Sequence, residues 1–159
     1  MITVELSVNA TSHRVPLEDP DTPLVYVLRN RLGLTGCKIG CGLEQCGSCA
    51  VLVDGVSRLS CVTPAREFEG TRITTIEGLG ATPVGRRVQR AFVTAGAAQC
   101  GYCTAGIIVA LSALLQRGLR PSQPQLRAAL EPHLCRCGAH PRILAAVRQL
   151  TGEDMTGEP

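Results

Sequence analysis

Eight of the nine cysteines fall into two closely spaced sets, and these sets constrain the fold more than any other feature. The first set follows the pattern C-x4-C-x2-C, with a fourth cysteine after eleven further residues: Cys41, Cys46, Cys49 and Cys61. The second set is C-x2-C and C-x-C separated by 31 residues: Cys100, Cys103, Cys135 and Cys137. The N-terminal residues lack the basic region and apolar core of a secretion signal. We therefore expect metal ligation rather than disulfides.

The first set has the ligand spacing of a plant-type [2Fe–2S] cluster. Four glycines lie in the same segment and permit a loop that turns its backbone N–H groups toward sulfur: Gly36, Gly40, Gly42 and Gly47. A structural four-thiolate zinc site is the alternative, although this spacing is less usual for zinc. Cys37 is expected to be a buried thiol outside the ligand set.

The spacing of the second set does not by itself distinguish a [2Fe–2S] cluster from a zinc ion. Its first pair comes just before an apolar segment, 104–116, that we expect to be a buried helix. Its second pair lies between two further expected helices. All four sulfurs can therefore meet at one end of a helical bundle. A thioredoxin-type redox motif is disfavoured because no βαβ pattern surrounds these cysteines.

The first half of the chain predicts a mixed α+β domain over residues 1–76. Alternating apolar residues indicate a hairpin from 2 to 17, and helical spacing follows from 24 to 32. Asp54-Gly55 indicates a tight turn between two strands, and a further short strand is expected at 72–75. We interpret 77–83, with two glycines and a proline, as a linker.

The second half, residues 84–159, predicts four short helices in a small bundle, ending in a polar tail. Ser122 and Gln125 form a capping box that opens a helix carrying Leu126, Leu130 and Leu134. The longest apolar segment is too short to span a membrane. The formal charge of +3 without a dense basic run does not suggest nucleic-acid binding.

The cysteine motifs together resemble the iron–sulfur subunit of molybdenum hydroxylases, the xanthine dehydrogenase and aldehyde oxidoreductase family. The resemblance covers roughly residues 1–150 and rests on four motifs in order: Gly36-Cys37-Lys38-Ile39-Gly40-Cys41-Gly42, Cys46-Gly47-Ser48-Cys49, Gln99-Cys100-Gly101-Tyr102-Cys103-Thr104 and Cys135-Arg136-Cys137-Gly138. It implies a plant-type ferredoxin-like β-grasp domain followed by a four-helix bundle. Each domain would hold one [2Fe–2S] cluster.

The resemblance also implies a role and partners. A large partner subunit would carry the molybdenum–pterin cofactor and the substrate site, and electrons would leave singly through the two clusters. The helical-domain cluster would lie nearer the pterin, with Gln99, Cys100 and Cys137 close to it. The β-grasp cluster would lie nearer the acceptor, which is a cytochrome c, a flavin (FAD) subunit or another protein.

Two departures from the family pattern matter: the first is a mild local change, and the second bears on the electron exit. Ala105 stands where the family commonly has proline after Cys-Thr. The ending Cys137-Gly138-Ala139-His140 resembles the branch that oxidises N-heteroaromatics such as isoquinoline and nicotinate, or aldehydes, with a cytochrome as acceptor. Arg136, between two ligands, and His140 are candidates for tuning the second cluster.

Two other functions remain open from the residues: a free-standing two-cluster ferredoxin, and a zinc-stabilised interaction module. The modest positive charge and the helical half argue against the first, and the colour of the purified protein would decide the second. We expect a cytoplasmic location, or a periplasmic one if a signal-bearing partner carries the chain across the membrane.

Overall fold

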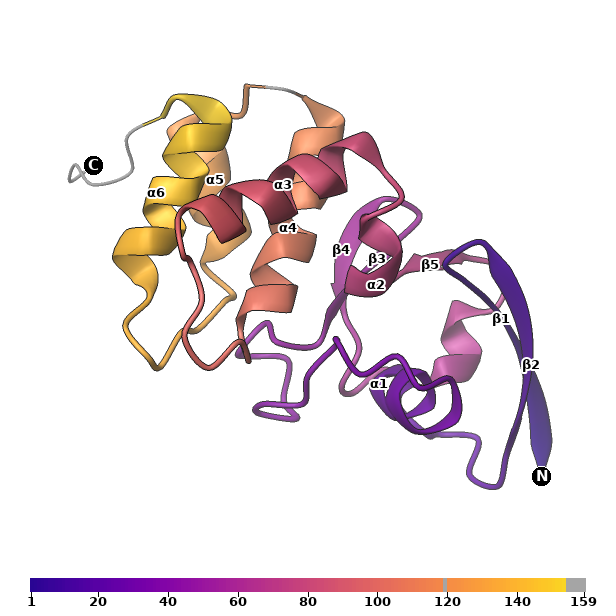
Figure 1. Cartoon of the computed structure of the whole chain (residues 1–159). Helices are drawn as coiled ribbons and strands as arrows, with labels where there is room; N and C mark the ends of the chain where they lie inside the picture. The colour runs from indigo at the N-terminus through magenta and orange to yellow at the C-terminus, as the bar shows by residue number, and fades with distance from the viewer. Residues whose placement is uncertain (119, 154–159) are drawn as a thin grey trace.

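A computed structural model describes residues 1–118 and 120–153. The N-terminal half forms a sheet with short helices, and longer helices from the C-terminal half pack beside it (Figure 1). The polar tail expected at the C-terminus lies, from residue 154 onward, outside the described residues. None of the described helices is long and apolar enough to cross a membrane.

The sheet is five-stranded within the described residues, in the order β2-β1-β5-β3-β4. Its strands are β1 (Ile2–Val8), β2 (Thr11–Leu17), β3 (Ala50–Val53), β4 (Val56–Leu59) and β5 (Arg72–Thr74). β1 and β5 run parallel, and the other neighbours run antiparallel. The tight turn expected at Asp54-Gly55 is confirmed, since both residues have positive φ, as a two-residue hairpin turn of this kind needs.

The interior strand β3 contributes to two hydrophobic cores. Its side chains alternate between the faces of the sheet, as the period of a strand requires. Ala50 and Leu52 belong to the core that includes the C-terminal helices. Val51 belongs to the core formed with β1, β2 and the first helix. β3 therefore joins the two halves of the chain, and the cysteine loop leads directly into it.

The helices of the N-terminal half are short. α1 (Leu24–Tyr26) continues into a π-helical segment, Val27–Arg31, and a 3₁₀ turn covers Ala65–Phe68. The residues expected as a linker contain most of α2 (Ile76–Leu79) and the N-cap of the next helix, Thr82. Glu77 in α2 accepts a hydrogen bond from the N–H of Gly36 and so ties the start of the cysteine loop to this helix.

Where the structure describes the C-terminal half, it has four helices: α3 (Pro83–Thr94), α4 (Thr104–Arg117), α5 (Gln123–Leu130) and α6 (His140–Thr151). α4 is the buried helix expected from its all-round apolar sequence, with ten of its fourteen residues buried. It packs against β3 on one side and against α3 and α5 on others. The α+β class expected from the sequence is confirmed.

The extent of one helix was wrong in the sequence-based prediction. The capping box of Ser122 and Gln125 is present, but α5 ends at Leu130 instead of including Leu134. Pro132 has no N–H to donate to the carbonyl oxygen four residues earlier, so the helical hydrogen bonds end at Glu131, whose N–H still donates to Arg127. The N–H of Leu134 donates instead to the carbonyl oxygen of Cys46, and its side chain is exposed. The chain thus turns away from the helix toward the first cysteine loop.

Candidate metal centres

The first cysteine set lies on the loop between the π-helical segment and β3, with Cys61 just after β4. Five backbone N–H groups donate to these sulfurs over donor-to-sulfur distances of 3.2 to 3.4 Å: those of Cys41, Leu43, Glu44, Gln45 and Ser60. N–H groups directed at sulfur stabilise negative charge there. This loop therefore suits thiolates that bind a metal.

The arrangement of the loop depends on close backbone approach at Gly40. A Cβ on this residue would lie 2.7 Å from the Cys46 sulfur. Any residue other than glycine would therefore push the sulfur out of its present position. Arg29 holds the start of the loop, because its guanidinium donates to the carbonyl oxygens of Thr35 and Cys37 at 2.7 Å.

The four sulfurs of the first set form two pairs. The Cys41 thiol lies close enough to that of Cys46 for their interaction to lower the pKa of Cys41, and the thiols of Cys49 and Cys61 likewise shift each other's pKa. Two irons that share four thiolates need two sulfurs each, so this pairing fits a [2Fe–2S] cluster. In residues 1–118 and 120–153, no three His, Cys, Asp or Glu side chains converge on a position for one metal ion.

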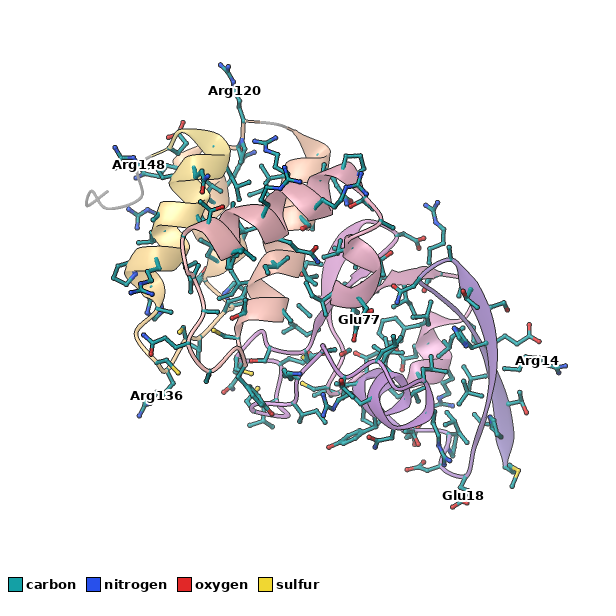
Figure 2. All side chains as sticks on the ribbon, viewed as in Figure 1. Arg14, Glu18, Glu77, Arg120, Arg136 and Arg148 are labelled. Atoms are coloured by element: carbon teal, nitrogen blue, oxygen red, sulfur yellow. The ribbon has the colours of Figure 1, made fainter. Side chains whose placement is uncertain are left out.

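The second set shows the same two-by-two arrangement. Cys100 contacts Cys137, and Cys103 contacts Cys135. The first pair of the sequence motif precedes α4 and the second lies between α5 and α6, as expected. In Figure 2, several sulfur atoms lie along the lower edge of the molecule, from near Arg136 toward its middle. Each of these two pairs therefore combines one cysteine from the C-x2-C motif with one from the C-x-C motif.

The thiols differ in how readily they ionise. Hydrogen bonds from backbone N–H groups, that of Leu43 foremost, lower the pKa of Cys41 to about 7. Burial raises the pKa of both Cys61 and Cys103 to about 11. Since a metal binds the thiolate, loading of either set must displace protons from its buried members.

The remaining residues singled out from the sequence lie at distinct places. Cys37 is buried, and its sulfur lies 3.6 Å from the Ser60 hydroxyl oxygen, outside the two pairs. Gln99 and Cys100 are exposed beside the second set. Arg136 and His140 are also exposed, and His140 begins α6.

Sequence reasoning missed three groups at the site. The Ser60 N–H donates to the Cys49 sulfur, and the Tyr102 hydroxyl donates to the carbonyl oxygen of Ile39. His133 packs against Gly47, in the middle of the first loop. These contacts join segments far apart in the sequence, and no local pattern predicts them.

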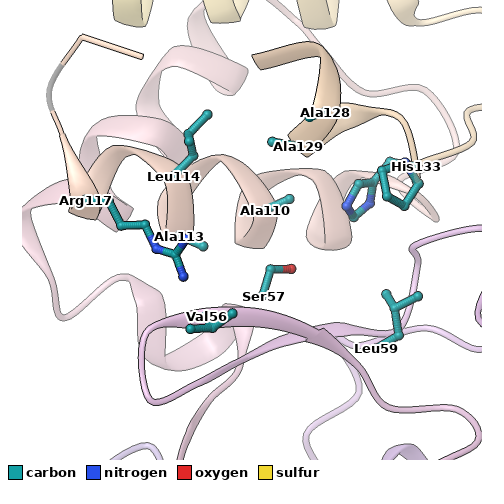
Figure 3. Close-up of a pocket in the computed structure, with 11 residues that line it drawn as sticks. Val56, Ser57, Leu59, Ala110, Ala113, Leu114, Arg117, Ala128, Ala129 and His133 are labelled. Carbon is teal, nitrogen blue, oxygen red and sulfur yellow. The ribbon is translucent and has the colours of Figure 1, made fainter. Parts of the chain in front are cut away.

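A separate groove of about 300 Å³ lies between β4, α4 and α5 (Figure 3). Small apolar side chains line most of it, with Arg117 near one end and His133 near the other. None of the cysteines of either set lines this groove.

Two family models match the chain. Residues 24–89 match a 2Fe-2S iron-sulfur cluster binding domain, and residues 75–148 match a [2Fe-2S] binding domain. The fold and the paired cysteines thus define a protein with two [2Fe–2S]-binding domains. The zinc interpretations that the spacing left open are set aside.

Relatives and solved structures narrow the class. The chain is 50% identical over 147 residues to a nicotinate dehydrogenase subunit of Pseudomonas putida, covering 92% of this chain and 93% of that one. It is 39% identical over 150 residues to the alpha subunit of isoquinoline 1-oxidoreductase of Brevundimonas diminuta, covering 94% and 98%. The structure of quinoline 2-oxidoreductase from Pseudomonas putida 86 matches with a TM-score of 0.84 at 35% identity, over 92% of this chain and 90% of that chain.

The chain therefore belongs to the family of [2Fe–2S] iron–sulfur subunits of molybdenum hydroxylases. The resemblance drawn from the motifs is confirmed. The chain is an electron-transfer component of an oxidoreductase and binds [2Fe–2S] clusters through two domains.

Proposed function

We propose that the chain holds one cluster on Cys41, Cys46, Cys49 and Cys61 and the other on Cys100, Cys103, Cys135 and Cys137. The observation that carries this assignment is the division of each set into two contacting pairs of thiols. When bound, a [2Fe–2S] cluster takes up and releases one electron at a time.

The protein's own groups prepare the first site for a negative charge. The N–H groups of Leu43 and Gln45 both donate to the Cys41 sulfur, at 3.3 and 3.2 Å. Hydrogen bonds to the sulfurs and exposure to solvent are main determinants of the potential of such a centre. The loop therefore favours the more negative, reduced form in addition to fixing the positions of the ligands.

The second site is proposed to face the molybdenum–pterin cofactor of a larger partner subunit. Cys100 and Gln99 are exposed at the edge of this site, and Cys137 contacts Cys100. The Gln99 amide offers both a donor and an acceptor, which suits the edge of a pterin ring. Gln99, Cys100 and Cys137 are thus proposed as the contact with that cofactor, and the first site as the exit.

We place the complex in the branch that oxidises N-heteroaromatic compounds. The supporting observation is that two relatives matched along nearly their whole length are named for nicotinate and isoquinoline. The His140-containing ending of the last cysteine motif supports the same branch, and with it a cytochrome c as acceptor. An FAD subunit is the other acceptor that the test must consider.

The domain assignment is also proposed. Residues 1–76 would form the β-grasp ferredoxin-like domain and 84–159 the four-helix domain, joined by 77–83. The two hydrophobic cores support this division, although β3 contributes to both. A cytoplasmic location is also proposed, since none of the nine cysteines forms a disulfide and eight are proposed cluster ligands.

Analysis of iron, acid-labile sulfide and molybdenum in the complex purified from its native source tests this function. We expect about four irons and about four sulfides for each copy of the chain, two of each per cluster. Molybdenum should be present in the same complex. Two irons per chain, or zinc in their place, would contradict the assignment.

A further inference from the structure

We propose that Gly106 and Tyr102 are positioning residues that hold the two cysteine loops at a fixed separation and orientation. The inference rests on the proposed function, in which each loop binds one cluster. It concerns residues that ligate nothing. The geometry that points to it is a set of direct contacts between the loop of residues 39–47 and the segments next to the second cysteine set.

Gly106 brings the first turn of α4 into contact with the first loop. A Cβ at this position would lie 2.1 Å from the carbonyl oxygen of Gly47 and 3.0 Å from its carbonyl carbon. Real Cβ atoms do not approach other atoms so closely, and a backbone carbonyl cannot rotate away as a side chain can. Cys103 is the N-cap of this helix, so the glycine fixes how near that cysteine comes to the first loop.

Gly47 is held from its other side as well. Its φ of +73° is in the left-handed region, and a Cβ there would lie 2.3 Å from Nδ1 of His133. One residue further along, the N–H of Leu134 donates to the carbonyl oxygen of Cys46 at 3.1 Å. Leu134 precedes Cys135, a proposed ligand of the second cluster. The first loop is therefore clamped between α4 and the segment 132–134.

Tyr102 adds a second link at a different point. It lies between Cys100 and Cys103, and its hydroxyl donates to the carbonyl oxygen of Ile39, two residues before Cys41. The side chain is 45% exposed, so loss of the hydroxyl leaves no buried cavity. Tyr102→Phe therefore removes the link between the loops and little else.

These contacts matter because the rate of electron transfer falls steeply with the distance between donor and acceptor. Gly106 contacts the backbone of Gly47, and Tyr102 contacts the backbone of Ile39. Both Gly106 and Tyr102 lie within three residues of the proposed ligand Cys103. A change at either link should alter the spatial relation of the two clusters while leaving the eight thiolates in place. The expected consequence is a change in how the clusters interact, without loss of iron.

The test compares Gly106→Ala and Tyr102→Phe with matched controls in the purified, cluster-loaded complex. Gly118→Ala is the control for the glycine, because it lies at the other end of α4 with nothing within 4 Å of the added Cβ. Tyr26→Phe is the control for the tyrosine, since Tyr26 is similarly exposed, at 41%, and lies in α1. Iron and sulfide content is measured for every variant.

Two readouts independent of turnover report the geometry. The first is the magnetic splitting between the two clusters in the electron paramagnetic resonance spectrum of the fully reduced complex, since dipolar coupling falls with the cube of the distance. The second is hydrogen–deuterium exchange of the Leu134 amide, which its bond to Cys46 should protect. We expect loss or broadening of the splitting and faster exchange in both variants, and neither change in the controls.

The outcomes separate this inference from the proposed function. If the unsubstituted complex lacks two clusters per chain, the proposed function fails. If it has both clusters and the two variants keep the splitting and the exchange rate of the unsubstituted complex, only the positioning role is overturned. Should Gly106→Ala fail to fold, Tyr102→Phe decides alone: altered splitting supports the role, and unaltered splitting with unaltered exchange overturns it.

Discussion

Ser60 separates two buried cysteines that have different roles. Its N–H donates to the Cys49 sulfur at 3.4 Å, and its hydroxyl donates to the Cys49 carbonyl oxygen at 2.7 Å. The same hydroxyl lies 3.6 Å from the Cys37 sulfur. Burial raises the pKa of Cys37 to about 11, and it raises the pKa of Cys49 and Cys61 as well, so thiol pKa does not separate the two proposed roles. What separates them is the interaction of the Cys49 thiol with that of Cys61, whereas the Cys37 sulfur lies beside the Ser60 hydroxyl.

Cys37→Ser and Cys49→Ser make a matched pair of variants in the same loop. We expect Cys37→Ser to retain about four irons per chain and Cys49→Ser to retain about two, because only Cys49 is a proposed ligand. Iron analysis together with electron paramagnetic resonance measures both. Loss of one cluster signal from Cys37→Ser would show that the ligand assignment is wrong.

Arg136 lies between two proposed ligands of the second cluster and is exposed. A nearby cation stabilises the reduced, more negative state of a cluster, although solvent weakens the effect at the surface. Arg136→Gln should therefore lower the potential of the second cluster by on the order of tens of millivolts. A redox titration followed by electron paramagnetic resonance resolves the two clusters.

The control for Arg136→Gln is Arg14→Gln. Arg14 is equally cationic but lies at the opposite side of the molecule (Figure 2), where it pairs with Glu5 at 3.2 Å. We expect it to leave both potentials unchanged. A shift in the first cluster alone after Arg136→Gln would contradict the assignment of the second set.

At the scale of elements, α4 is the helix on which both halves depend. It contacts β3, and it begins directly after Cys103. Leu111, near its middle, is fully buried in the core that β3 shares with the C-terminal helices. Damage to its packing should therefore lower the stability of the entire chain.

Leu111→Ala removes a buried side chain from this helix without introducing a poor helix former. We expect a loss of about 2–5 kcal/mol in the free energy of unfolding, the usual range for such a truncation. Val93→Ala in α3 is the matched control, since Val93 is 81% exposed and should change stability by less than about 0.5 kcal/mol. Urea unfolding followed by circular dichroism measures both. Equal effects would contradict the central role of α4.

Structural features that depend on neighbouring residues could be predicted from the sequence. Features that depend on contacts between distant segments could not. The hairpin turn at Asp54-Gly55, the capping box at Ser122 and the burial of α4 follow from neighbouring residues. The early end of α5 has a local signal in Pro132, but the hydrogen bond from the Leu134 N–H to Cys46, far away in the sequence, has none. Likewise, the spacing identified the two cysteine sets, but which sulfurs contact one another depends on the folded loops.

At the scale of the molecule, the two metal centres belong to one continuous structure. β3 carries side chains into both cores, and the loop before it contacts the segments around the second cysteine set. A carrier that diffuses freely does not require two centres fixed to each other, whereas a relay inside a complex does. The arrangement therefore favours a subunit over a free-standing ferredoxin.

Size and metal content of the native assembly distinguish these two functions. A subunit should elute from gel filtration well ahead of a 159-residue monomer, together with molybdenum and a larger chain. Gln99 and Cys100 are exposed, and a face that is proposed to meet a cofactor on another chain should be covered in the native state. The control is the same chain produced alone and loaded with iron and sulfide, which should elute as the small species. A native protein that elutes at the monomer position with two clusters and no molybdenum would show a free-standing ferredoxin instead.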